Sequence, residues 1–218
     1  MNFRKIGGCS IFNADCMEYM RTLPDKFFDL AIVDPPYGIG AGSVSFKNGS
    51  SKSEKPYFKS KVNDWDKSAP GADYFDLLRR VSDNQIIWGG NYFLDHLGAT
   101  RCMVFWDKTI HGNSYADGEL AWTSFDMNIR YYRENIVQTT SEGRIHPTQK
   151  SIKLYEWILT NYAKPGQKIF DSHMGSGSSA IACNNLGFEF VGCELDADYF
   201  NAACKRIEHH ASQERLFA

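Results

Sequence analysis

The sequence predicts an α/β protein built on a doubly wound, mostly parallel sheet, and two observations support this. Short apolar segments alternate with segments of helical spacing along most of the chain, which is typical of parallel strands joined by helices. Residues 30–33 (LAIV) are continuously apolar, as a strand buried on both faces requires. We therefore expect helices on both faces of the sheet.

The expected elements follow one another from residue 10 to about residue 210. The expected strands cover residues 10–15, 28–33, 85–90, 102–108, 168–171 and 188–196. The expected helices cover residues 16–23, residues 74–81, a segment after residue 150, residues 178–186, and a last segment that ends near residue 210. Residues 38–70, rich in Gly, Ser and Lys without an apolar period, predict a mobile loop.

The composition fits one folded domain with a sizeable core. The chain has 218 residues, of which 43% are hydrophobic and 23% are charged. The start carries no signal peptide pattern, and no run approaches the roughly 18 apolar residues of a membrane span. The six cysteines include no CxxC pair. We therefore expect a cytoplasmic protein with reduced cysteines, no metal and no membrane contact.

The formal net charge of −2 conceals an uneven distribution. Residues 38–63 carry five lysines against one acid, a net +4, so the remainder of the chain sums to −6. The lysines of this basic loop are Lys47, Lys52, Lys55, Lys59 and Lys61. A concentrated basic patch on an acidic protein is a candidate for contacts with the phosphates of a nucleic acid.

Residues 168–196 have the pattern strand, glycine turn, helix, strand, acid. Gly175 and Gly177 allow a tight turn and a close approach of the backbone to a ligand. Glu194 ends the second strand, where a carboxylate can accept hydrogen bonds from both hydroxyls of a ribose. The pattern also satisfies the dinucleotide fingerprint, so a nicotinamide cofactor remains an alternative. Asp171, placed on the turn, would repel a pyrophosphate and suit a cationic ligand such as an adenosyl sulfonium with an amino-acid tail.

A second motif, Asp34-Pro35-Pro36-Tyr37, follows the expected strand 28–33. The two prolines stiffen the turn and leave its carbonyls unused. The Asp34 carboxylate and the Pro35 carbonyl can both accept from one amino group, while the Tyr37 ring offers a face for stacking. This combination suits an aromatic amine, because two acceptors on its hydrogens localise the nitrogen lone pair for attack on a methyl group.

Taken together and in this order, the motifs resemble the amino-methyltransferases of DNA, in particular the circularly permuted beta group. The matching segments are NADC at 13–16, DPPYG at 34–38, HPTQK at 146–150, DSHMGSGSS at 171–179 and GCELD at 192–196. They span nearly the whole chain. The segments WGGNYF, FWDK and ELAWTSF look like those of small solitary adenine methylases of phage and prophage.

The resemblance implies one methyltransferase domain over residues 1–218, with a permuted, Rossmann-like sheet of seven strands. It implies transfer of a methyl group from S-adenosylmethionine to the N6 amine of a flipped adenine in DNA, without a metal. The Asp before the two prolines favours adenine over cytosine. The implied catalytic residues are Asp34, Pro35, Pro36 and Tyr37. The implied cofactor residues are Asp15, Cys16, Asp34, His146, Pro147, Thr148, Gln149, Lys150, Asp171, Ser172, His173, Met174, Gly175, Ser176, Gly177, Ser178, Glu194, Leu195 and Asp196.

Within this set the resemblance assigns Asp15 to the adenine amine of the cofactor, Glu194 to its ribose, and residues 146–150 to its methionine end. Two departures concern the turn. Asp-Ser-His stands at 171–173 where the family commonly has Asp-Pro-Phe, and two serines stand at 178–179 where it has two threonines. They keep the acid and the glycines, so they bear on the tightness of cofactor binding.

Recognition of the target would fall to residues 109–145, a short insertion. Its arginines, Arg130, Arg133 and Arg144, are candidates for contacts with DNA. A homodimer that borrows a neighbour's surface is an open alternative. The competing functions are methylation of cytosine N4 in DNA or of adenine in RNA, a nicotinamide oxidoreductase, and a partner subunit without catalysis.

Overall fold

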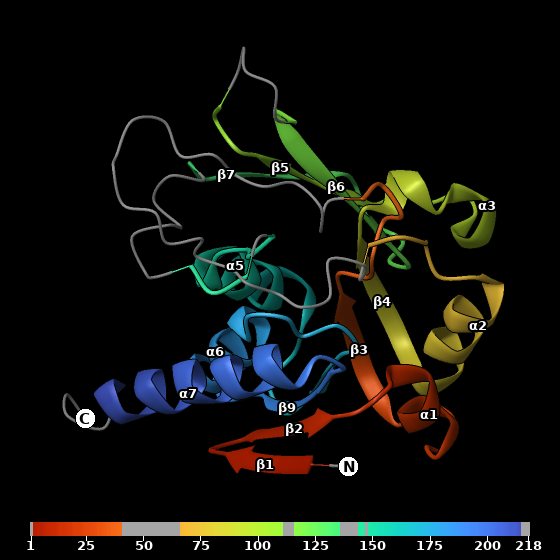
Figure 1. Cartoon of the computed structure of the whole chain (residues 1–218). Coiled ribbons are helices and arrows are strands. Elements are labelled where there is room, and N and C mark those ends of the chain that lie inside the picture. Colours follow the sequence, from red (N-terminus) through yellow and green to blue (C-terminus); the bar gives the residue numbers. More distant parts are fainter. Residues whose placement is uncertain (1, 41–65, 111–115, 136–143, 147, 215–218) are drawn as a thin grey trace.

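The computed structural model describes residues 2–40, 66–110, 116–135, 144–146 and 148–214 (Figure 1). Its strands are β1 (Asn2–Ile6), β2 (Cys9–Asn13), β3 (Phe28–Val33), β4 (Ser82–Trp88), β5 (Met103–Asp107), β6 (Gly118–Thr123), β7 (Arg130–Arg133), β8 (Lys168–Asp171) and β9 (Glu189–Glu194). Its helices are α1 (Cys16–Arg21), α2 (Ala72–Val81), the 3₁₀ turn η2 (Gly90–Tyr92), α3 (Leu94–Leu97), α5 (Ile152–Tyr162), α6 (Ser178–Asn185) and α7 (Ala197–Glu214).

The strands form one mixed sheet in the order β1-β2-β9-β8-β3-β4-β6-β5-β7. The five strands from β2 to β4 are mutually parallel, whereas β1 pairs antiparallel with β2 at one edge. On the other side β6 runs antiparallel to β4 and β5, and β7 pairs parallel with β5. The centre of the sheet is therefore parallel.

Helices cover both faces of the sheet, as the alternation of segments predicted. Helices α5, α6 and α7 lie on one face, and α1, α2 and α3 lie on the other (Figure 1). Strand β3 serves both faces, because Leu30 and Ile32 belong to the first core whereas Ala31 and Val33 belong to the second. Such a strand is buried on both sides, which explains its unbroken apolar sequence.

The sheet has nine strands among the described residues rather than the seven that were expected. Strand β1 adds a strand at one edge through a tight hairpin at Gly7 and Gly8. It was missed because four of its five residues are exposed and give no apolar run. Strands β6 and β7 come from the stretch 109–145, so part of the expected target-recognition insertion belongs to the central sheet.

The chain reverses its winding direction between β3 and β8, which are neighbours. After β3 it passes through α2 to β4 on one side, and after β8 it passes through α6 to β9 on the other. The loops at the two carboxyl ends thus diverge, and open α/β sheets bind ligands in the crevice at such a switch point. Both motifs of the sequence, residues 34–37 and 171–177, follow these two strands.

The segment 38–70 is described only at its two ends, and its lysine-bearing middle lies outside the described residues. The ends are held together by Asp66, which is buried. Its carboxylate accepts from the Gly38 N–H at 2.8 Å, and its carbonyl accepts from the Gly40 N–H at 3.1 Å. No helix in the described part of the chain is long and apolar enough to cross a membrane.

Candidate active site

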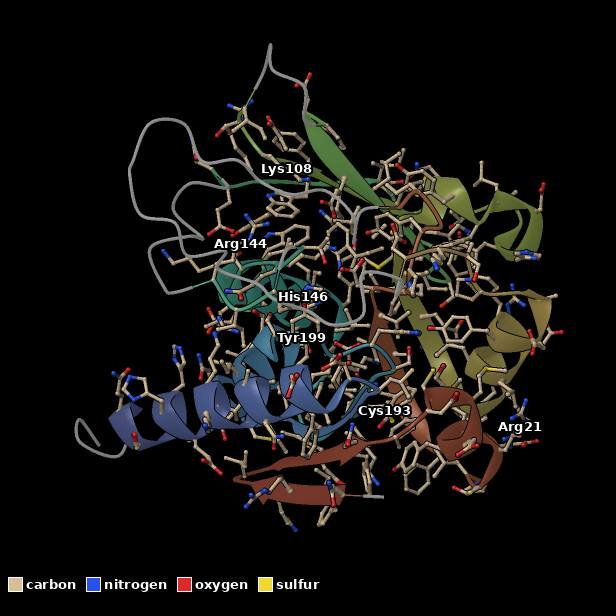
Figure 2. The ribbon with its side chains drawn as sticks, viewed as in Figure 1. Arg21, Lys108, Arg144, His146, Cys193 and Tyr199 are labelled. Carbon is tan, nitrogen blue, oxygen red and sulfur yellow. The ribbon has the colours of Figure 1, made fainter. Side chains whose placement is uncertain are left out.

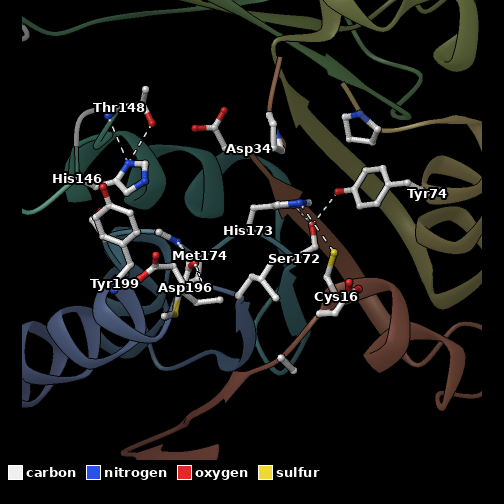
Figure 3. A pocket seen from close by; sticks show the side chains of 18 of the residues that line it. Cys16, Asp34, Tyr74, His146, Thr148, Ser172, His173, Met174, Asp196 and Tyr199 are labelled. Carbon is white, nitrogen blue, oxygen red and sulfur yellow. Dashed lines mark hydrogen bonds between the residues drawn. The ribbon is translucent and has the colours of Figure 1, made fainter. Parts of the chain in front are cut away.

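A cavity of about 660 Å³ lies at the carboxyl ends of β2, β3, β8 and β9, beside the segment that precedes α5 (Figure 3). Most residues predicted for catalysis or cofactor binding line it. They are Asp15, Cys16, Asp34, Pro36, His146, Thr148, Gln149, Lys150, Ser172, His173, Met174, Gly175, Ser176, Ser178, Glu194, Leu195 and Asp196. Of the other predicted residues, Pro35, Tyr37, Asp171 and Gly177 are not in this lining, and Pro147 lies outside the described residues.

The turn after β8 depends on two glycines with positive φ, Gly175 at 52° and Gly177 at 75°. A Cβ on Gly177 would lie 2.9 Å from the Ile207 side chain of α7, so only glycine fits there. The Gly175 N–H donates to the Glu194 carboxylate at 2.9 Å, which ties this turn to the end of β9. On the far side, Arg206 of α7 donates to the Ser176 carbonyl at 3.0 Å.

The Asp171 side chain holds the turn after β8 by hydrogen bonds and is not part of the cavity lining. Its carboxylate accepts from the Ser179 hydroxyl at 2.6 Å and from the His173 N–H at 3.0 Å, and the residue is buried. Burial raises the pKa of Asp171 to about 7. Any repulsion of a pyrophosphate by Asp171, which the sequence suggested, would therefore act through the wall of the cavity and not by direct contact.

Two other acids at the strand ends face the cavity. The Glu194 carboxylate accepts from the N–H groups of Gly175 and Asp196, both at 2.9 Å, and burial raises the pKa of Glu194 to about 7. Asp15 caps helix α1 by accepting from the Met17 N–H at 2.7 Å. Both side chains are thus held in place by backbone groups before any ligand enters.

The Asp34 carboxylate has partners on both oxygens. It accepts from the Tyr37 hydroxyl at 2.6 Å and from the Lys150 ammonium at 2.5 Å. The Tyr37 ring stacks on the Tyr92 ring with centroids 4.9 Å apart, and a Cβ on Gly89 would lie 2.2 Å from it. Burial raises the pKa of Asp34, and the Lys150 ammonium opposes that rise.

Lys150 also contacts a second acid, Glu119 of β6, with 3.0 Å between ammonium and carboxylate. Glu119 in turn pairs with Lys108, which directly follows β5, at 2.5 Å. Burial alone would lower the pKa of Lys150, but the carboxylates of Asp34 and Glu119 outweigh it and raise that pKa. Lys150 had been predicted to close the methionine end of a cofactor site, and the structure shows its ammonium on Asp34.

Two histidines border the cavity in different settings (Figure 3). Nδ1 of His146 is 3.1 Å from the Thr148 hydroxyl, and its ring packs against Tyr199 of α7. Nδ1 of His173 is 2.8 Å from the Ser172 hydroxyl. Burial lowers the pKa of each histidine to about 4, so both are neutral near pH 7.

The charged residues in the walls of the cavity are mostly acids. The acids among the described lining residues are Asp15, Asp34, Asp73, Glu194 and Asp196, against the single cation Lys150. Such walls favour a ligand with positive charge and disfavour the two negative charges of a pyrophosphate. Within the described residues, no group of three His, Cys, Asp or Glu side chains is arranged to hold a metal ion.

Comparison with known proteins places this site in a family. A model of the DNA methylase family of the N6/N4 type matches residues 87–205, more than half of the chain. The chain belongs to this family. It is therefore a DNA methyltransferase, and the family covers adenine N6 as well as cytosine N4.

Individual relatives are distant but cover most of the chain. The type II methyltransferase M2.DpnII of Streptococcus pneumoniae is 21% identical over 91% of this chain and 89% of its own length. The structure of M1.HpyAVI with S-adenosylmethionine has a TM-score of 0.59 at 21% identity, over 91% of this chain and 99% of its own. The cytosine-N4-specific PvuII DNA methyltransferase has a TM-score of 0.59 at 11% identity, over 97% of this chain and 96% of its own. These structural similarities establish a shared fold.

Of the residues predicted to contact DNA, the structure describes only the three arginines. The five lysines from Lys47 to Lys61 lie outside the described residues. Arg130 and Arg133 lie on β7, where Arg133 pairs with Asp107 at 3.0 Å. Arg144 donates to the His146 carbonyl at 3.1 Å, which places it beside the cavity (Figure 2).

Several residues of the site were not predicted from the sequence. Tyr74 of α2 forms a hydrogen bond with Ser172 at 2.7 Å, and Tyr155 of α5 lines the cavity. Both tyrosines occupy ordinary core positions of amphipathic helices, so their sequence pattern did not mark them as site residues. Glu119 could have been noticed, because a lone acid stands at the start of the apolar run Leu120–Ala121–Trp122 in a strand.

Proposed function

We propose that the chain is a single-domain, site-specific methyltransferase that transfers the methyl group of S-adenosylmethionine to the N6 amine of adenine in DNA. One observation carries the proposal. The Asp34 carboxylate lines the same cavity as the Gly175 turn and Glu194, at the switch point of the sheet. A group that can hold an aromatic amine thus lies beside a turn that can hold a nucleoside.

The residues around the cavity fit S-adenosylmethionine. A positively charged sulfur and an ammonium group suit the acidic walls. We assign Glu194 to the ribose hydroxyls, because its carboxylate is held at the end of β9. We assign Asp15 to the adenine amine, and the turn 172–178 with residues 146–149 to the methionine end, since the Lys150 ammonium is engaged by Asp34. The structure of M1.HpyAVI bound to S-adenosylmethionine, which shares this fold, supports the choice of cofactor.

The protein contributes positioning and electrostatics. When bound, S-adenosylmethionine supplies a methyl group that passes to the amine nitrogen while the electron pair of the broken bond stays on sulfur. Asp34 and the Pro35 carbonyl accept hydrogen bonds from the two amine hydrogens and hold the nitrogen in place. The Asp34 carboxylate then stabilises the positive charge that develops on the nitrogen, and the surplus proton leaves to water.

The target base must leave the DNA stack to reach Asp34, which costs a few kcal/mol. Tyr37 can offset about 1–3 kcal/mol of this cost if its ring stacks on the base. In the structure its hydroxyl occupies one Asp34 oxygen, at 2.6 Å. When the base enters, its amine would therefore donate to this Asp34 oxygen in place of the Tyr37 hydroxyl. The oxygen would then keep a hydrogen-bond partner throughout.

We further propose the permuted arrangement of the beta group, because the catalytic segment after β3 precedes the cofactor turn after β8 in the chain. The basic loop 38–70 and the arginines Arg130, Arg133 and Arg144 are our candidates for DNA contacts. A homodimer stays a prediction, which light scattering of the purified protein would test.

The test is to incubate the protein with unmethylated genomic DNA and methyl-labelled S-adenosylmethionine, and then to identify the modified nucleoside by mass spectrometry. We expect N6-methyladenine in a defined sequence context. Exclusive N4-methylcytosine would contradict the choice of adenine, and the cytosine-N4-specific PvuII enzyme shows that this fold supports that alternative. Label in RNA but not in DNA would contradict DNA as the substrate.

A further inference from the structure

Four charged side chains of alternating sign connect the catalytic turn to the β5–β6 pair. They are Lys108 after β5, Glu119 of β6, Lys150 before α5, and Asp34 after β3. The successive distances between charged atoms are 2.5, 3.0 and 2.5 Å. Asp34, the Lys108–Glu119 pair and Lys150 come from three separate parts of the sequence, so the fold assembles the row.

The row is shielded from solvent. The Lys150 side chain is 3% exposed, and the side chains of Lys108, Asp34 and Glu119 are 11%, 16% and 23% exposed. A buried charge without a partner is strongly destabilising, and alternation gives each inner member two partners of opposite sign.

Aromatic rings support both ammonium groups. The Lys150 ammonium lies 5.1 Å from the centroid of the Trp88 ring, and the Lys108 ammonium lies 5.3 Å from the centroid of the Trp106 ring. Trp88 ends β4 and Trp106 lies in β5, and both rings are buried. The lysines are thus placed by packing as well as by charge.

We propose that Lys150 is a positioning residue for Asp34, which it keeps ionised and fixed in orientation, and that Glu119, itself paired with Lys108, holds Lys150 in that place. The inference rests on the proposed function, in which Asp34 must accept a hydrogen bond from the target amine. A protonated carboxyl would offer a donor where the reaction needs an acceptor.

Among the described residues, the surroundings of Asp34 leave this task to Lys150. The described ionisable groups whose charges act on Asp34 or that Asp34 influences are Tyr37, Tyr74, Glu119, Lys150, Tyr155 and Asp171. Lys150 is the one cation in this set, whereas Glu119 and burial both favour the protonated acid. Loss of the Lys150 charge would therefore raise the pKa of Asp34 and move the acidic limb of activity to higher pH.

Lys150→Met, Lys150→Arg and Glu119→Gln test the proposal through the pH dependence of single-turnover methylation at saturating cofactor. We expect Lys150→Met to move the acidic limb upward by about 1–3 pH units, the usual effect of removing one adjacent opposite charge. Lys150→Arg should restore most of the wild-type profile. Glu119→Gln, which leaves Lys150 in the chain, should lower the plateau rate because the ammonium loses one of its two anchors, and it should not move the acidic limb upward because Glu119 itself favours the protonated form of Asp34.

A second readout does not depend on catalysis. The Asp34 carboxyl can be titrated by carbon NMR in protein labelled at aspartate, with Asp34→Asn used to assign its signal. An upward shift of the titration in Lys150→Met would support the proposal even if the wild type methylates no DNA, in which case the proposed function alone fails. An unchanged titration, or a uniformly lower rate with an unmoved limb, would overturn it. If Lys150→Met does not fold, a Glu119→Gln protein with the rate of the wild type would overturn it as well.

Discussion

At the scale of single residues, the proposed catalytic turn, residues 34–37, depends on a close approach between Gly89 and the Tyr37 ring. Gly89 has a φ of 69°, and a Cβ there would lie 2.2 Å from Tyr37. We expect Gly89→Ala to destabilise the protein by about 2–4 kcal/mol, because strain at positive φ adds to overpacking. Methylation should fall as well, since the Tyr37 ring must move and its hydroxyl donates to Asp34. Urea denaturation and a methylation assay measure the two effects.

Gly187→Ala is the matched control. Gly187 has a φ of 74°, but a Cβ there would meet nothing within 4 Å. This variant should lose only about 1–2 kcal/mol, the cost of the backbone conformation, and should keep its activity. Equal losses of stability and activity in both variants would refute the role of the Tyr37 contact.

Glu194 gives the cofactor site a pH dependence. Burial raises the pKa of this acid from its ordinary value near 4.5 to about 7, so it carries a proton below neutral pH. A cationic cofactor favours the ionised form, and its affinity should therefore increase as the pH rises from 6 to 8, by at most about tenfold per pH unit. Calorimetric titration with S-adenosylmethionine checks this. Glu194→Gln should bind more weakly and with a flatter pH profile, and an unchanged profile in that variant would contradict the assignment.

At the scale of elements, Asp171 holds the turn between β8 and α6 in place. Its carboxylate accepts two hydrogen bonds, from the Ser179 hydroxyl and from the His173 N–H. At pH 8, above the pKa of about 7 that burial gives Asp171, Asp171→Ala should therefore cost about 2–4 kcal/mol of stability and weaken cofactor binding, because a hydrogen bond to a charged group contributes about 1.5–3 kcal/mol. Ser179→Ala removes one of these two hydrogen bonds and should therefore lower the stability by less. A variant Asp171→Ala with wild-type stability and affinity would mean that the turn holds its shape unaided.

The elements themselves were largely predictable. Each of the six expected strands and five expected helices is present, because buried parallel strands and amphipathic helices leave a clear apolar pattern. Strands β1 and β7 escaped prediction because exposed edge strands have no such pattern. Strand β6 escaped because it was included in an expected insertion. The topology that makes β3 and β8 neighbours is a property of the whole sheet and followed only from the resemblance.

The candidate site was predicted as a set of motifs and not as a set of contacts. Asp34, Gly175 and Glu194 stand in segments with distinctive spacing, and the structure brings them to one cavity. The pairing of Lys150 with Asp34 joins residues 116 positions apart, which no local pattern encodes. Glu119 was visible only as an acid in an apolar strand.

At the scale of the whole molecule, the uneven charge distribution sets how DNA would bind. A protein with a net charge of −2 must dock through a local basic surface, and residues 38–63 carry +4. Replacing the five lysines of this loop by glutamine should weaken DNA binding regardless of sequence. The slope of log affinity against log salt should fall by about 0.9 for each phosphate that the loop no longer neutralises. Binding titrations at several salt concentrations measure this slope.

Arg101→Gln is the control for this experiment. Arg101 precedes β5, at the amino edge of the sheet and away from the cavity, and its side chain is 70% exposed. The Arg101→Gln variant removes a cation from a distant surface, so it should leave the slope of log affinity against log salt unchanged. An unchanged slope in the five-lysine variant would exclude the loop as a phosphate-binding segment.

The most direct test of the central claim compares the wild type with Asp34→Asn in methyl transfer to DNA, while calorimetry follows the binding of S-adenosylmethionine to both. Asparagine keeps the shape of the side chain but removes the charge that accepts from the amine. We expect N6-methyladenine from the wild type, and a rate at least about 100-fold lower from Asp34→Asn with cofactor affinity nearly intact. Near-normal turnover by Asp34→Asn would show that the Asp34 carboxylate is not needed for methyl transfer.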